Sequence, residues 1–499
     1  MSHPLRAYYD LLHLELPSGQ EGDQLIGGLS YDSRVVAPQS LFICKGAHFS
    51  PAYLDQAIAQ GAIAYVSEID YQRTIPCLKV SDIRSVLASL AAFYYDHPER
   101  DLSLFAITGT KGKTTSAHYL HAILTGTSQR PVGLFSSTNI FDGRSDRPSS
   151  LTTPEPIELF STLASCRRNG CREVVMEVSS QALKYGRISG LELDHAGFLN
   201  ISEDHISSIE HRDFEDYFSS KLKIFAHARH AYLNLDADYQ DRLFQAAQAC
   251  ERRTSFSMKE PADYRGRLGA DRRTGFELFV QHADEEVLFQ LSNLGAYNAE
   301  NALLAIAMAG ESGRSLSQMV DPLAHVRIEG RSECFECLDG GVVAMVDYAH
   351  NRLSFEMLFD EVDQLFPEYQ TIAIFGAPGV KAQNRRKDLG EVAGQRMDLS
   401  ILTLEDPKDE DPQKICEEIA HYVKQAGGAY RIIVDREEAV RTAFQIARKA
   451  WEEQGRKSLI LILGKGTEPT HTIRGREVEI PSDYCLAKEL TDQWSSLCK

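Results

Sequence analysis

Short apolar runs recur along most of the chain, separated by stretches with the spacing of amphipathic helices. Continuous apolar strands that alternate with helical stretches of about 10–15 residues are typical of parallel sheets covered by helices on both faces. The pattern therefore predicts an α/β protein with parallel-rich sheets. The runs that we expect to form its strands are Leu104–Ile107, Val132–Phe135, Val174–Val178, Ala196–Leu199, Ala231–Leu233, Val342–Val346, Thr371–Phe375, Ser400–Leu404, Arg431–Val434 and Leu459–Leu463.

The pattern also divides the chain into three predicted domains. Its 499 residues exceed the size at which a single hydrophobic core stops growing, about 250 residues. Residues 1–100 would form a smaller N-terminal α/β domain, residues 101–327 a central domain, and residues 328–499 a C-terminal domain built from a second alternating set. In the first block we expect strands at Leu41–Cys44, Ala62–Val66 and Cys77–Val80 and a helix at Ile83–Tyr95.

Charge and composition narrow the range of partners. The chain has 53 basic and 71 acidic residues, a formal net charge of −18, which argues against a nucleic-acid partner. No apolar run approaches the ~18 residues of a membrane-spanning helix, and the first residues lack the pattern of a signal peptide. We therefore expect a cytoplasmic protein with free thiols, and at Cys334–Cys337 a strand rather than a metal site.

The sequence of residues 102–120 predicts a buried strand, a loop and the first turns of a helix. The loop Thr108–Gly112 has room for an anion, and Lys113–Thr115 opens a helix whose N-terminal amides carry partial positive charge. This arrangement suits a nucleoside triphosphate with Mg²⁺. The generic motif would place a further glycine at Ile107, so the match is partial. A Gly-Lys-Thr turn without a ligand remains the alternative.

Two polar residues follow the next predicted strands. Glu177 ends its strand at the usual place for a carboxylate that meets the Mg²⁺ of a phosphate loop, although it could instead cap the following helix. His205 could face the same cavity, or be a hydrogen-bonded structural histidine.

Lys221 lies on an apolar stripe of a predicted helix, together with Phe214, Tyr217, Phe218 and Phe225. A charged ammonium on an inward face is costly unless it is paired or loses its charge. A salt bridge or a side chain that reaches the helix edge is one solution. The other is a neutral amine that captures carbon dioxide and becomes a carbamate, an anionic metal ligand. On the same helix, Lys223 should be solvated.

Ten short motifs then appear in one order across nearly the whole chain. They are Tyr31–Arg34, Gly109–Thr115, Leu151–Pro154, Met176–Ser180 with Arg187, Asp204–His205, Tyr217 with Lys221, Asn298–Asn301, Gly330–Arg331, Asp347–His350 and Gly464–Gly466. Together they resemble the Mur ligases, and within that family the MurE type, which adds the third amino acid to the peptidoglycan precursor. The resemblance implies an N-terminal UDP-binding domain, a central P-loop ATPase domain and a C-terminal Rossmann-like domain that binds the amino acid.

The resemblance also implies roles for individual residues. Ser33 would contact the UDP group, and the UDP-MurNAc-dipeptide would be held by Thr152, Thr153, Ser179 and Arg187. ATP would be bound by Thr110, Lys111, Gly112, Lys113, Thr114, Thr115, Asn301, Arg331, Asp347 and His350. Two Mg²⁺ ions would be held by Thr114, Glu177, His205 and a carbamylated Lys221, and the catalytic residues would be Lys113, Glu177, His205 and Lys221.

The implied reaction joins an amino acid to a carboxylate at the expense of ATP. The γ-carboxylate of D-glutamate would attack the γ-phosphate of ATP, and Lys113 with Mg²⁺ would offset the repulsion between these anions. An amine would then attack the acyl phosphate to give an amide. Since an acyl phosphate hydrolyses readily, we expect domain closure to exclude water.

The C-terminal block indicates which amino acid is added. Members of the family that add meso-diaminopimelate carry Asp-Asn-Pro-Arg at a strand end, where the arginine clamps the distal carboxylate. Here Glu405, Asp406, Pro407 and Lys408 replace it, and two carboxylates suit a distal ammonium. We therefore predict an L-lysine-adding ligase, with L-ornithine and meso-diaminopimelate as alternatives. The predicted substrate-binding residues here are Lys381, Glu405, Asp406, Lys408 and Glu468.

Three further expectations complete the sequence-based interpretation. The basic cluster at 385–387 should be a solvated helix start, and the protein should be a monomer. A ligase resembling folylpolyglutamate synthetase is a second interpretation, against which the Asp32–Arg34 segment and the Thr152–Thr153 pair speak. A third interpretation is an ATP-binding paralogue that no longer forms amides. The presence of all four predicted catalytic residues argues against it; they are Lys113, Glu177, His205 and Lys221.

Overall fold

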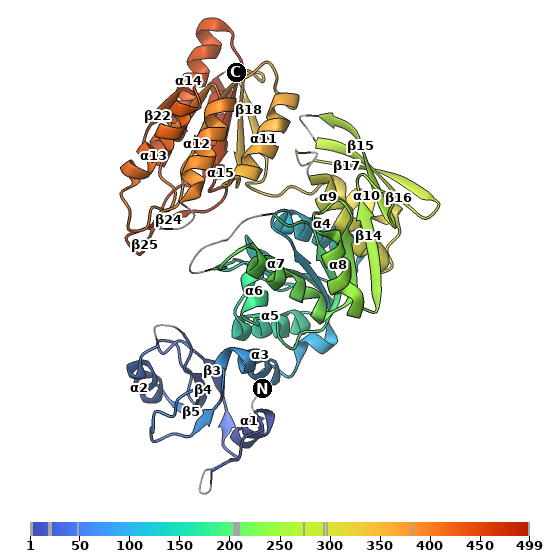
Figure 1. Ribbon diagram of the computed structural model, residues 1–499, viewed down its shortest axis with the longest axis vertical. Coiled ribbons are helices and arrows are strands. Elements are labelled where there is room, and N and C mark those ends of the chain that lie inside the picture. The colour runs from blue at the N-terminus through green and yellow to red at the C-terminus, as the bar shows by residue number, and fades with distance from the viewer. Residues whose placement is uncertain are drawn as a thin grey trace. The chain divides into compact units, whose positions relative to one another are not determined.

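The computed structural model describes residues 3–17, 22–46, 49–202, 210–272, 275–292, 295, 298–380 and 383–497. The chain forms two compact units, and Figure 1 labels their helices and strands. Unit 1 comprises residues 1–204, 213–265 and 301–322, and unit 2 comprises residues 205–212, 266–300 and 323–499.

Unit 1 begins with a four-stranded parallel sheet in the order β3-β4-β5-β6. Its strands are β3 (Gly28–Ser30), β4 (Ser40–Ile43), β5 (Ala62–Ser67) and β6 (Cys77–Lys79). A two-stranded ribbon and three helices accompany it, namely β1 (His3–Pro4), β2 (Leu25–Ile26), α1 (Leu5–Leu11), α2 (Pro51–Ala59) and α3 (Ile83–Tyr94). The side chains of Ser50 and Asp82 cap α2 and α3, so each helix starts where its cap satisfies a free amide.

A larger sheet makes up the rest of unit 1, with its strands in the order β10-β9-β8-β11-β7-β12-β13-β14. Strands β8, β11, β7, β12, β13 and β14 are parallel, and β9 and β10 extend the edge antiparallel. The bounds are β7 (Ser103–Thr108), β8 (Val132–Phe135), β9 (Asn139–Phe141), β10 (Asp146–Pro148), β11 (Glu173–Glu177), β12 (Leu193–Phe198), β13 (Ala228–Asn234) and β14 (Arg252–Ser257). β15 (Tyr264–Arg272) follows in parallel with β14.

Helices connect most of these parallel strands, and others flank the sheet at its start and after β17 (Glu285–Leu291). They are η1 (Pro98–Asp101), α4 (Lys113–Thr127), α5 (Pro156–Arg168), α6 (Ser180–Lys184), α7 (Phe214–Leu222), η2 (Lys223–His227), α8 (Gln240–Ala246), η3 (Ala247–Ala249), α9 (Asn298–Glu311) and α10 (Leu316–Ala324). One continuous core fills the space between this sheet and α5, α6 and α7, with Phe198 and Phe218 among its largest members.

Three aromatic side chains on β12 and β13, two of them buried and one half-buried, are expected to make unit 1 sensitive to acid. The hydroxyl of Tyr232 lies 2.7 Å from Nδ1 of His195 and 3.3 Å from Nδ1 of His230. Burial lowers the pKa of both histidines to about 4, and the charges of Arg252 and, for His195, Arg314 act in the same direction.

We therefore expect unit 1 to lose stability as the pH falls. The unfolded chain takes up a proton on each histidine near pH 6.5, whereas the folded chain does so only near pH 4. Stability from these groups is complete above pH 6.5 and is lost between these values, by an amount on the order of 1–3 kcal/mol. Thermal unfolding midpoints at pH 7.5 and 5.0 measure it. The double variant His195→Gln, His230→Gln should show a smaller pH difference than the native chain, and an equal difference would contradict the assignment.

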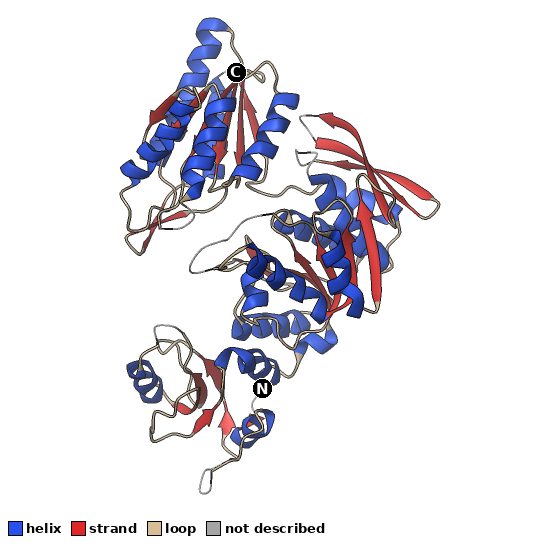
Figure 2. Ribbon diagram, viewed as in Figure 1, coloured by secondary structure: helices blue, strands red, loops and turns tan. Residues whose placement is uncertain are grey.

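Unit 2 contains a six-stranded sheet in the order β18-β19-β23-β20-β21-β22, in which only the edge strand β18 is antiparallel. One core packs α11, α12 and α13 on one face, and a second core packs α14 and α15 on the other, so helices cover both sides (Figure 2). The bounds are β18 (Glu333–Cys337), β19 (Val342–Asp347), α11 (Arg352–Leu365), β20 (Gln370–Phe375), α12 (Asn384–Arg396), β21 (Leu399–Leu402), α13 (Pro412–Gln425), β22 (Tyr430–Ile432), α14 (Arg436–Gln454), β23 (Ser458–Leu463) and α15 (Asp483–Leu497).

The ten strands expected from apolar runs in the two larger blocks are all confirmed, with small shifts of their ends. The strand expected at Cys334–Cys337 is confirmed as β18. The apolar runs did not predict the antiparallel pairs β16 (Gly275–His282) with β17 (Glu285–Leu291) and β24 (Thr470–Ile473) with β25 (Arg476–Glu479). These strands alternate polar and apolar residues or are largely exposed, so they lack the continuous apolar signal of a strand buried on both faces.

Candidate active site

The phosphate-loop candidate connects β7 to α4 in unit 1. Gly112 precedes the helix with φ of +82°, a conformation that glycine adopts without a steric penalty. A Cβ at this position would lie 2.0 Å from Oδ1 of Asn301, the α9 residue expected to help bind ATP. Ser116 also donates a hydrogen bond to the Asn301 carbonyl at 3.0 Å. The structure thus brings Asn301 against the loop, although 189 residues separate it from Gly112 in the sequence.

Two lysines point at the same backbone oxygen of this loop. Nζ of Lys113 lies 2.8 Å from the Gly109 carbonyl oxygen, and Nζ of Lys221 lies 2.7 Å from it. Lys221 is 1% exposed, so its side chain does not reach the surface, and its Nζ lies 4.8 Å from the centre of the Tyr217 ring. The Tyr217 hydroxyl donates to Oγ1 of Thr110 at 3.1 Å, which fixes α7 against the loop. The inward orientation of Lys221 is confirmed, as is the exposure of Lys223.

Glu177 lies at the end of β11, fully buried, and faces the first turn of α4. Oε2 accepts a hydrogen bond from Oγ1 of Thr114 at 3.2 Å, and Oε1 accepts one from the backbone amide of Ser137 at 2.7 Å. The alternative that Glu177 caps the next helix is wrong, because Ser179 is the residue whose side chain caps α6. A carboxylate beside a threonine hydroxyl at a helix N-terminus supplies the oxygen ligands that Mg²⁺ prefers, so these residues fit that ion.

Ser137 is a member of this site that the sequence reasoning missed. Besides its amide contact, its hydroxyl donates to Glu177 Oε2 at 3.1 Å, and its Oγ lies 3.1 Å from Oγ1 of Thr152. A signal was available, because Ser137 directly follows the apolar run of β8, and β8 is the parallel neighbour of β11. The carboxyl ends of adjacent parallel strands meet at one edge of a sheet.

Two of the predicted residues, His205 and Lys381, lie outside the described residues, so their roles stay predictions. Within the described ranges, no group of three or more His, Cys, Asp or Glu side chains has the arrangement of a metal site.

The four residues expected to hold the UDP-MurNAc-dipeptide gather beside Glu177. Oγ1 of Thr153 donates to the Glu177 carbonyl at 3.0 Å and accepts from the Ser179 amide at 3.0 Å. Arg187 donates to the Thr153 carbonyl at 3.0 Å, and Thr152 is held through Ser137 as described above. The phosphate loop, the carboxylate and the expected substrate residues therefore form one hydrogen-bonded network.

A small hollow of about 160 Å³ opens next to this network in unit 1, and Arg187 belongs to both. Glu155, which helps to line it, forms ion pairs with Arg187 at 2.9 Å and with Lys45, which lies shortly after β4. Ser33, expected to contact UDP, is buried elsewhere in the N-terminal part and donates to Gln56 at 2.9 Å. The residues that line the hollow are Lys45, Arg84, Leu87, Glu155, Pro156, Tyr185 and Arg187.

The remaining residues expected at the ATP site cluster in unit 2, at the end of β19. Asp347 accepts hydrogen bonds from the backbone amides of Ser332 at 2.8 Å and Ala349 at 2.7 Å, and burial raises the pKa of its carboxyl while Arg331 opposes that shift. The Arg331 guanidinium stacks over the Tyr348 ring at 4.6 Å. His350 Nδ1 lies 2.6 Å from the Tyr348 carbonyl oxygen. These residues are brought together by the fold of unit 2 alone.

A second polar cluster in unit 2 lies beyond the ends of β21 and β23. Glu405 is buried there, and a Cβ at Gly464 would lie 2.4 Å from its Oε2, so only glycine lets the two strand ends approach. Lys465 forms ion pairs with Asp406, at 3.0 Å, and with Glu468. The backbone of Lys408 pairs with β24 through its amide, which donates to the Thr472 carbonyl at 2.9 Å.

The expectation for the basic cluster at 385–387 is wrong for one of its members. Arg386 is buried, and its guanidinium forms ion pairs with Glu410 and Glu418, both at 2.8 Å. It therefore holds the loop after β21 against α12 and α13. Lys387 is exposed, as expected for a solvated helix start. The helical periodicity of a short basic run did not distinguish the inward position from its neighbours.

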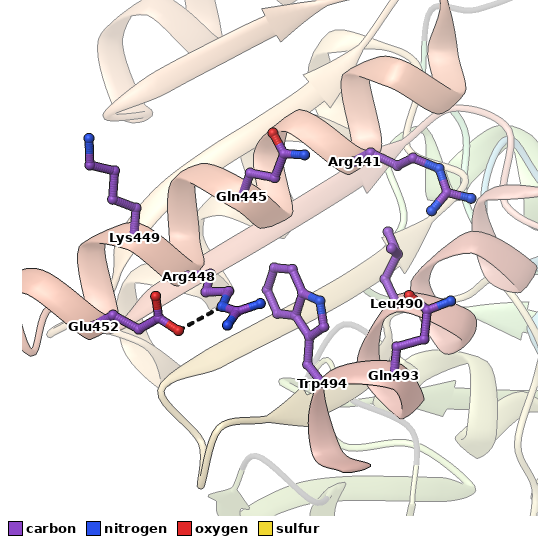
Figure 3. A pocket seen from close by; sticks show the side chains of 8 residues that line it. All are labelled: Arg441, Gln445, Arg448, Lys449, Glu452, Leu490, Gln493 and Trp494. Carbon is purple, nitrogen blue, oxygen red and sulfur yellow. Dashed lines mark hydrogen bonds and ion pairs between the residues drawn. The ribbon is translucent and has the colours of Figure 1, made fainter. Parts of the chain in front are cut away.

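Another hollow in unit 2, of about 400 Å³, lies between α14 and α15 (Figure 3). Its arginines are already paired with glutamates on the helix surface: Arg448 with Glu452 at 2.7 Å, and Arg441 with Glu437 at 2.8 Å. The arrangement offers stacking on Trp494 but no group suited to phosphoryl transfer or amide formation. The residues that line it are Arg441, Gln445, Arg448, Lys449, Glu452, Leu490, Gln493 and Trp494.

Comparison with known proteins identifies the family. The model of the Mur ligase middle domain matches residues 107–309, and that of the Mur ligase glutamate ligase domain matches residues 330–466. A UDP-N-acetylmuramoyl-L-alanyl-D-glutamate–L-lysine ligase from Streptococcus pyogenes serotype M6 is 37% identical over 466 residues, covering 92% of each chain. The chain belongs to the Mur ligase family.

Solved structures agree with the fold of this Mur ligase. A UDP-N-acetylmuramoyl-L-alanyl-D-glutamate–2,6-diaminopimelate ligase aligns over 99% of both chains with a TM-score of 0.68 at 23% identity. The folylpolyglutamate synthase of Mycobacterium tuberculosis, complexed with ADP, covers 76% of this chain and 92% of its own, with a TM-score of 0.63 at 16% identity. These identities establish the shared fold. In the part of this Mur ligase that the structure describes, no helix combines the length and apolar character needed to cross a bilayer.

Proposed function

We propose that this Mur ligase joins L-lysine to the γ-carboxylate of D-glutamate in UDP-MurNAc-L-Ala-D-Glu, with ATP as the energy source. The observation that carries the proposal is the network of Thr114, Glu177, Ser137 and Thr153, which ties a phosphate loop to the residues expected to hold an acidic sugar-peptide. Two observations support L-lysine as the third amino acid. The similar Streptococcus pyogenes protein is named as an L-lysine ligase, and position 408 of this chain is a lysine instead of an arginine.

The residues have distinct tasks in the proposed reaction. Lys113 would hold the phosphates of ATP beside the amides at the start of α4. Arg187, fixed by the Thr153 carbonyl, would orient the dipeptide so that its carboxylate faces the γ-phosphate. Mg²⁺, held by Thr114, Glu177, His205 and a carbamylated Lys221, would supply positive charge that lets two anions approach.

The surroundings of Lys221 support the proposed carbamate on its side chain. Its amine and that of Lys113 contact the same carbonyl oxygen, so two ammonium groups would repel each other in a buried place. A carbamate on Lys221 replaces that repulsion by attraction and adds a second anionic ligand beside Glu177. Because these two anionic ligands and the ATP phosphates together carry enough negative charge for more than one divalent cation, the proposal includes two Mg²⁺ ions.

Lys221→Ala is expected to lower kcat at least about 100-fold, since a metal ligand is lost. Acetate or another short-chain carboxylic acid should restore part of the activity by supplying a carboxylate in the same place. Phosphate release with ATP, UDP-MurNAc-L-Ala-D-Glu and L-lysine measures it. The matched control is Lys223→Ala, two residues along the same segment but exposed, which should be near normal. Normal turnover of Lys221→Ala without additives would contradict the carbamate.

The wider organisation is part of the same proposal. Residues 1–100 would bind UDP through Ser33, residues 101–327 would carry the ATPase, and residues 328–499 would bind the amino acid and complete the ATP site through Arg331, Asp347 and His350. The enzyme would act as a monomer in the cytoplasm.

A panel of amino acids tests the proposed function. Phosphate release should require both UDP-MurNAc-L-Ala-D-Glu and an amino acid, and L-lysine should be preferred over L-ornithine and meso-diaminopimelate. Preference for either of the latter would refute the choice of L-lysine while leaving the ligase reaction. Dependence on a folate and glutamate would indicate the folylpolyglutamate synthase reaction instead, and no stimulated turnover would indicate a paralogue without ligase activity.

A further inference from the structure

Two cysteines meet at the end of α5 in unit 1. Cys166 lies in the last turn of this helix, and Cys171 lies three residues beyond its end, shortly before β11. Both side chains are free thiols, with exposed fractions of 0% and 1%. The ligase reaction proposed above uses neither of them, so their pairing calls for an explanation of its own.

The backbone at the end of α5 sets the spacing of these two residues. The amide of Cys171 donates to the Cys166 carbonyl at 3.0 Å, and the amide of Gly170 donates to the Arg167 carbonyl at 3.2 Å. With Gly170 at φ of +89°, these are the two hydrogen bonds of a Schellman motif. Such a motif commonly packs two apolar side chains against each other at these positions. Here both side chains are thiols.

The two thiols are in direct contact. A hydrogen bond from Cys166 lowers the pKa of the Cys171 thiol, although burial and the charge of Asp142 oppose that shift. The same contact, together with burial, raises the pKa of the Cys166 thiol. Since the thiolate is the reactive form of cysteine, the contact makes Cys171 the nucleophile of the pair and Cys166 its neutral partner.

Cys171 also lies closer to the surface than Cys166. Both chain neighbours of Cys171 are exposed, whereas a Cβ at Gly133 of β8 would lie 2.9 Å from the sulfur of Cys166. The turn between β9 and β10 covers Cys171, whose sulfur lies 3.7 Å from the Asp142 carbonyl oxygen and would lie 2.5 Å from a Cβ at Gly143. β10 is an edge strand with all three residues exposed. Local opening of such an edge gives a small molecule access to Cys171.

Other cysteines that lie near one another are not placed to pair in this way. Cys44 follows β4 and Cys77 lies on β6, on opposite sides of β5. Two strand spacings of about 4.8 Å separate them, whereas a disulfide needs Cα atoms within about 7 Å. Cys334 and Cys337 lie on β18, and their side chains pack in the cores on opposite faces of the sheet.

We propose that Cys166 and Cys171 form a reversible disulfide when the protein meets hydrogen peroxide. The Cys171 thiolate attacks one peroxide oxygen, the O–O bond breaks, and a sulfenic acid and hydroxide result. The proton that Cys171 released converts this hydroxide to water. The sulfur of Cys166 then attacks the sulfenic acid, an S–S bond replaces the S–O bond, and a second water leaves with the Cys166 proton. Two thiols are oxidised, and one peroxide is reduced to two water molecules.

The disulfide protects unit 1 from permanent oxidation. A sulfenic acid without a neighbouring thiol goes on to a sulfinic acid, which dithiothreitol does not reduce. That acid would place a charge in the core beneath the β9–β10 turn, where both cysteines are buried. Cys166 stops the oxidation at a stage that thiols reverse. Peroxide is small enough to enter under the turn, whereas a bulky disulfide such as that of glutathione is excluded.

Peptide mass spectrometry tests the site in the native chain. The folded protein is treated with hydrogen peroxide, unfolded in acid, alkylated and digested. The peptide with a Cys166–Cys171 disulfide should exceed any Cys44–Cys77 product at least about tenfold, because only the first pair has the required spacing. Glutathione disulfide at the same concentration should give little of it. Retention of both thiols in the reduced form, or an unselective mixture of disulfides, would overturn the proposal.

Three variants test the roles of the two thiols. After peroxide, Cys166→Ala should carry a sulfinic acid at Cys171, and dithiothreitol should not restore its thermal unfolding midpoint, whereas the native protein should recover fully. Cys171→Ala should leave Cys166 largely reduced. Cys416→Ala, which removes an equally buried thiol on α13, should form the disulfide as the native protein does.

The contrary results are equally specific. Oxidation of Cys166 in Cys171→Ala as fast as that of Cys171 in Cys166→Ala would refute the choice of nucleophile. Full recovery of Cys166→Ala with dithiothreitol would refute protection. The peptide experiment uses the native chain, so it decides whether the disulfide forms even if a variant does not fold. None of these readouts depends on the ligase reaction, so failure of the proposed function would leave them unchanged.

Discussion

Glu177→Gln should lower kcat about 10³-fold while leaving the fold intact. The amide has the shape of the carboxylate, its oxygen can still accept from the Ser137 amide, and its NH2 group can donate to the Thr114 hydroxyl, so packing changes little. What it loses is the negative charge that would hold Mg²⁺ at the start of α4, and losses of about 10²–10³ are usual when one electrostatic contact to the transition state is removed.

Steady-state phosphate release and a thermal unfolding curve check this expectation together. Glu192→Gln is a suitable control, because Glu192 is exposed and, among the residues that the structure describes, forms its ion pair with Arg229 on the surface. It should have near-normal activity. If Glu177→Gln turned over at the rate of the control, Glu177 would be a structural residue and the metal site would have to lie elsewhere.

Gly112→Ala should lower kcat/KM for ATP about 100-fold. The added Cβ meets Oδ1 of Asn301 at 2.0 Å, so either α9 or the phosphate loop must move. The φ of +82° adds a conformational cost of about 1–2 kcal/mol for any residue with a Cβ. Since the loop amides would bind phosphate only in one geometry, displacement of the loop should weaken nucleotide binding.

The chain offers a matched control for the conformational cost alone. Gly170 has φ of +89° and nothing within 4 Å of an added Cβ. Gly170→Ala should therefore incur a conformational cost similar to that of Gly112→Ala and lower the thermal unfolding midpoint accordingly. Its KM for ATP should stay unchanged. If the two alanine variants behaved alike in ATP kinetics, the contact between Gly112 and Asn301 would have no functional weight.

Much of the candidate site could be predicted because strand ends carry chemistry in parallel sheets. Glu177 and Glu405 each follow an apolar run, and each lies where that run predicts. The helical spacing of Phe214, Tyr217, Phe218 and Lys221 predicted that Lys221 lies on the inward stripe, and the structure places its side chain there. These signals are local, so one sequence is enough to read them.

Residues that act through partners far along the chain could not be predicted in this way. Ser137 hydrogen-bonds Glu177 forty residues later, and Lys45 pairs with Glu155, which lies 110 residues further along the chain. Arg386 belongs to a basic run that was expected at the surface. It is nevertheless buried, and it forms ion pairs with two glutamates on other elements. No local pattern encodes such pairings, because they depend on which elements the fold places together.

The sequence by itself determined the α/β class, the phosphate loop and the family resemblance, because periodicity and motif spacing are properties of short segments. Only the tertiary structure decided that Asn301 packs on Gly112, that two lysines contact one carbonyl oxygen, and that Lys465 occupies Asp406 and Glu468. Whether a buried charge is available to a ligand depends on the charges already beside it, and those neighbours come from strands and loops that are distant in the chain.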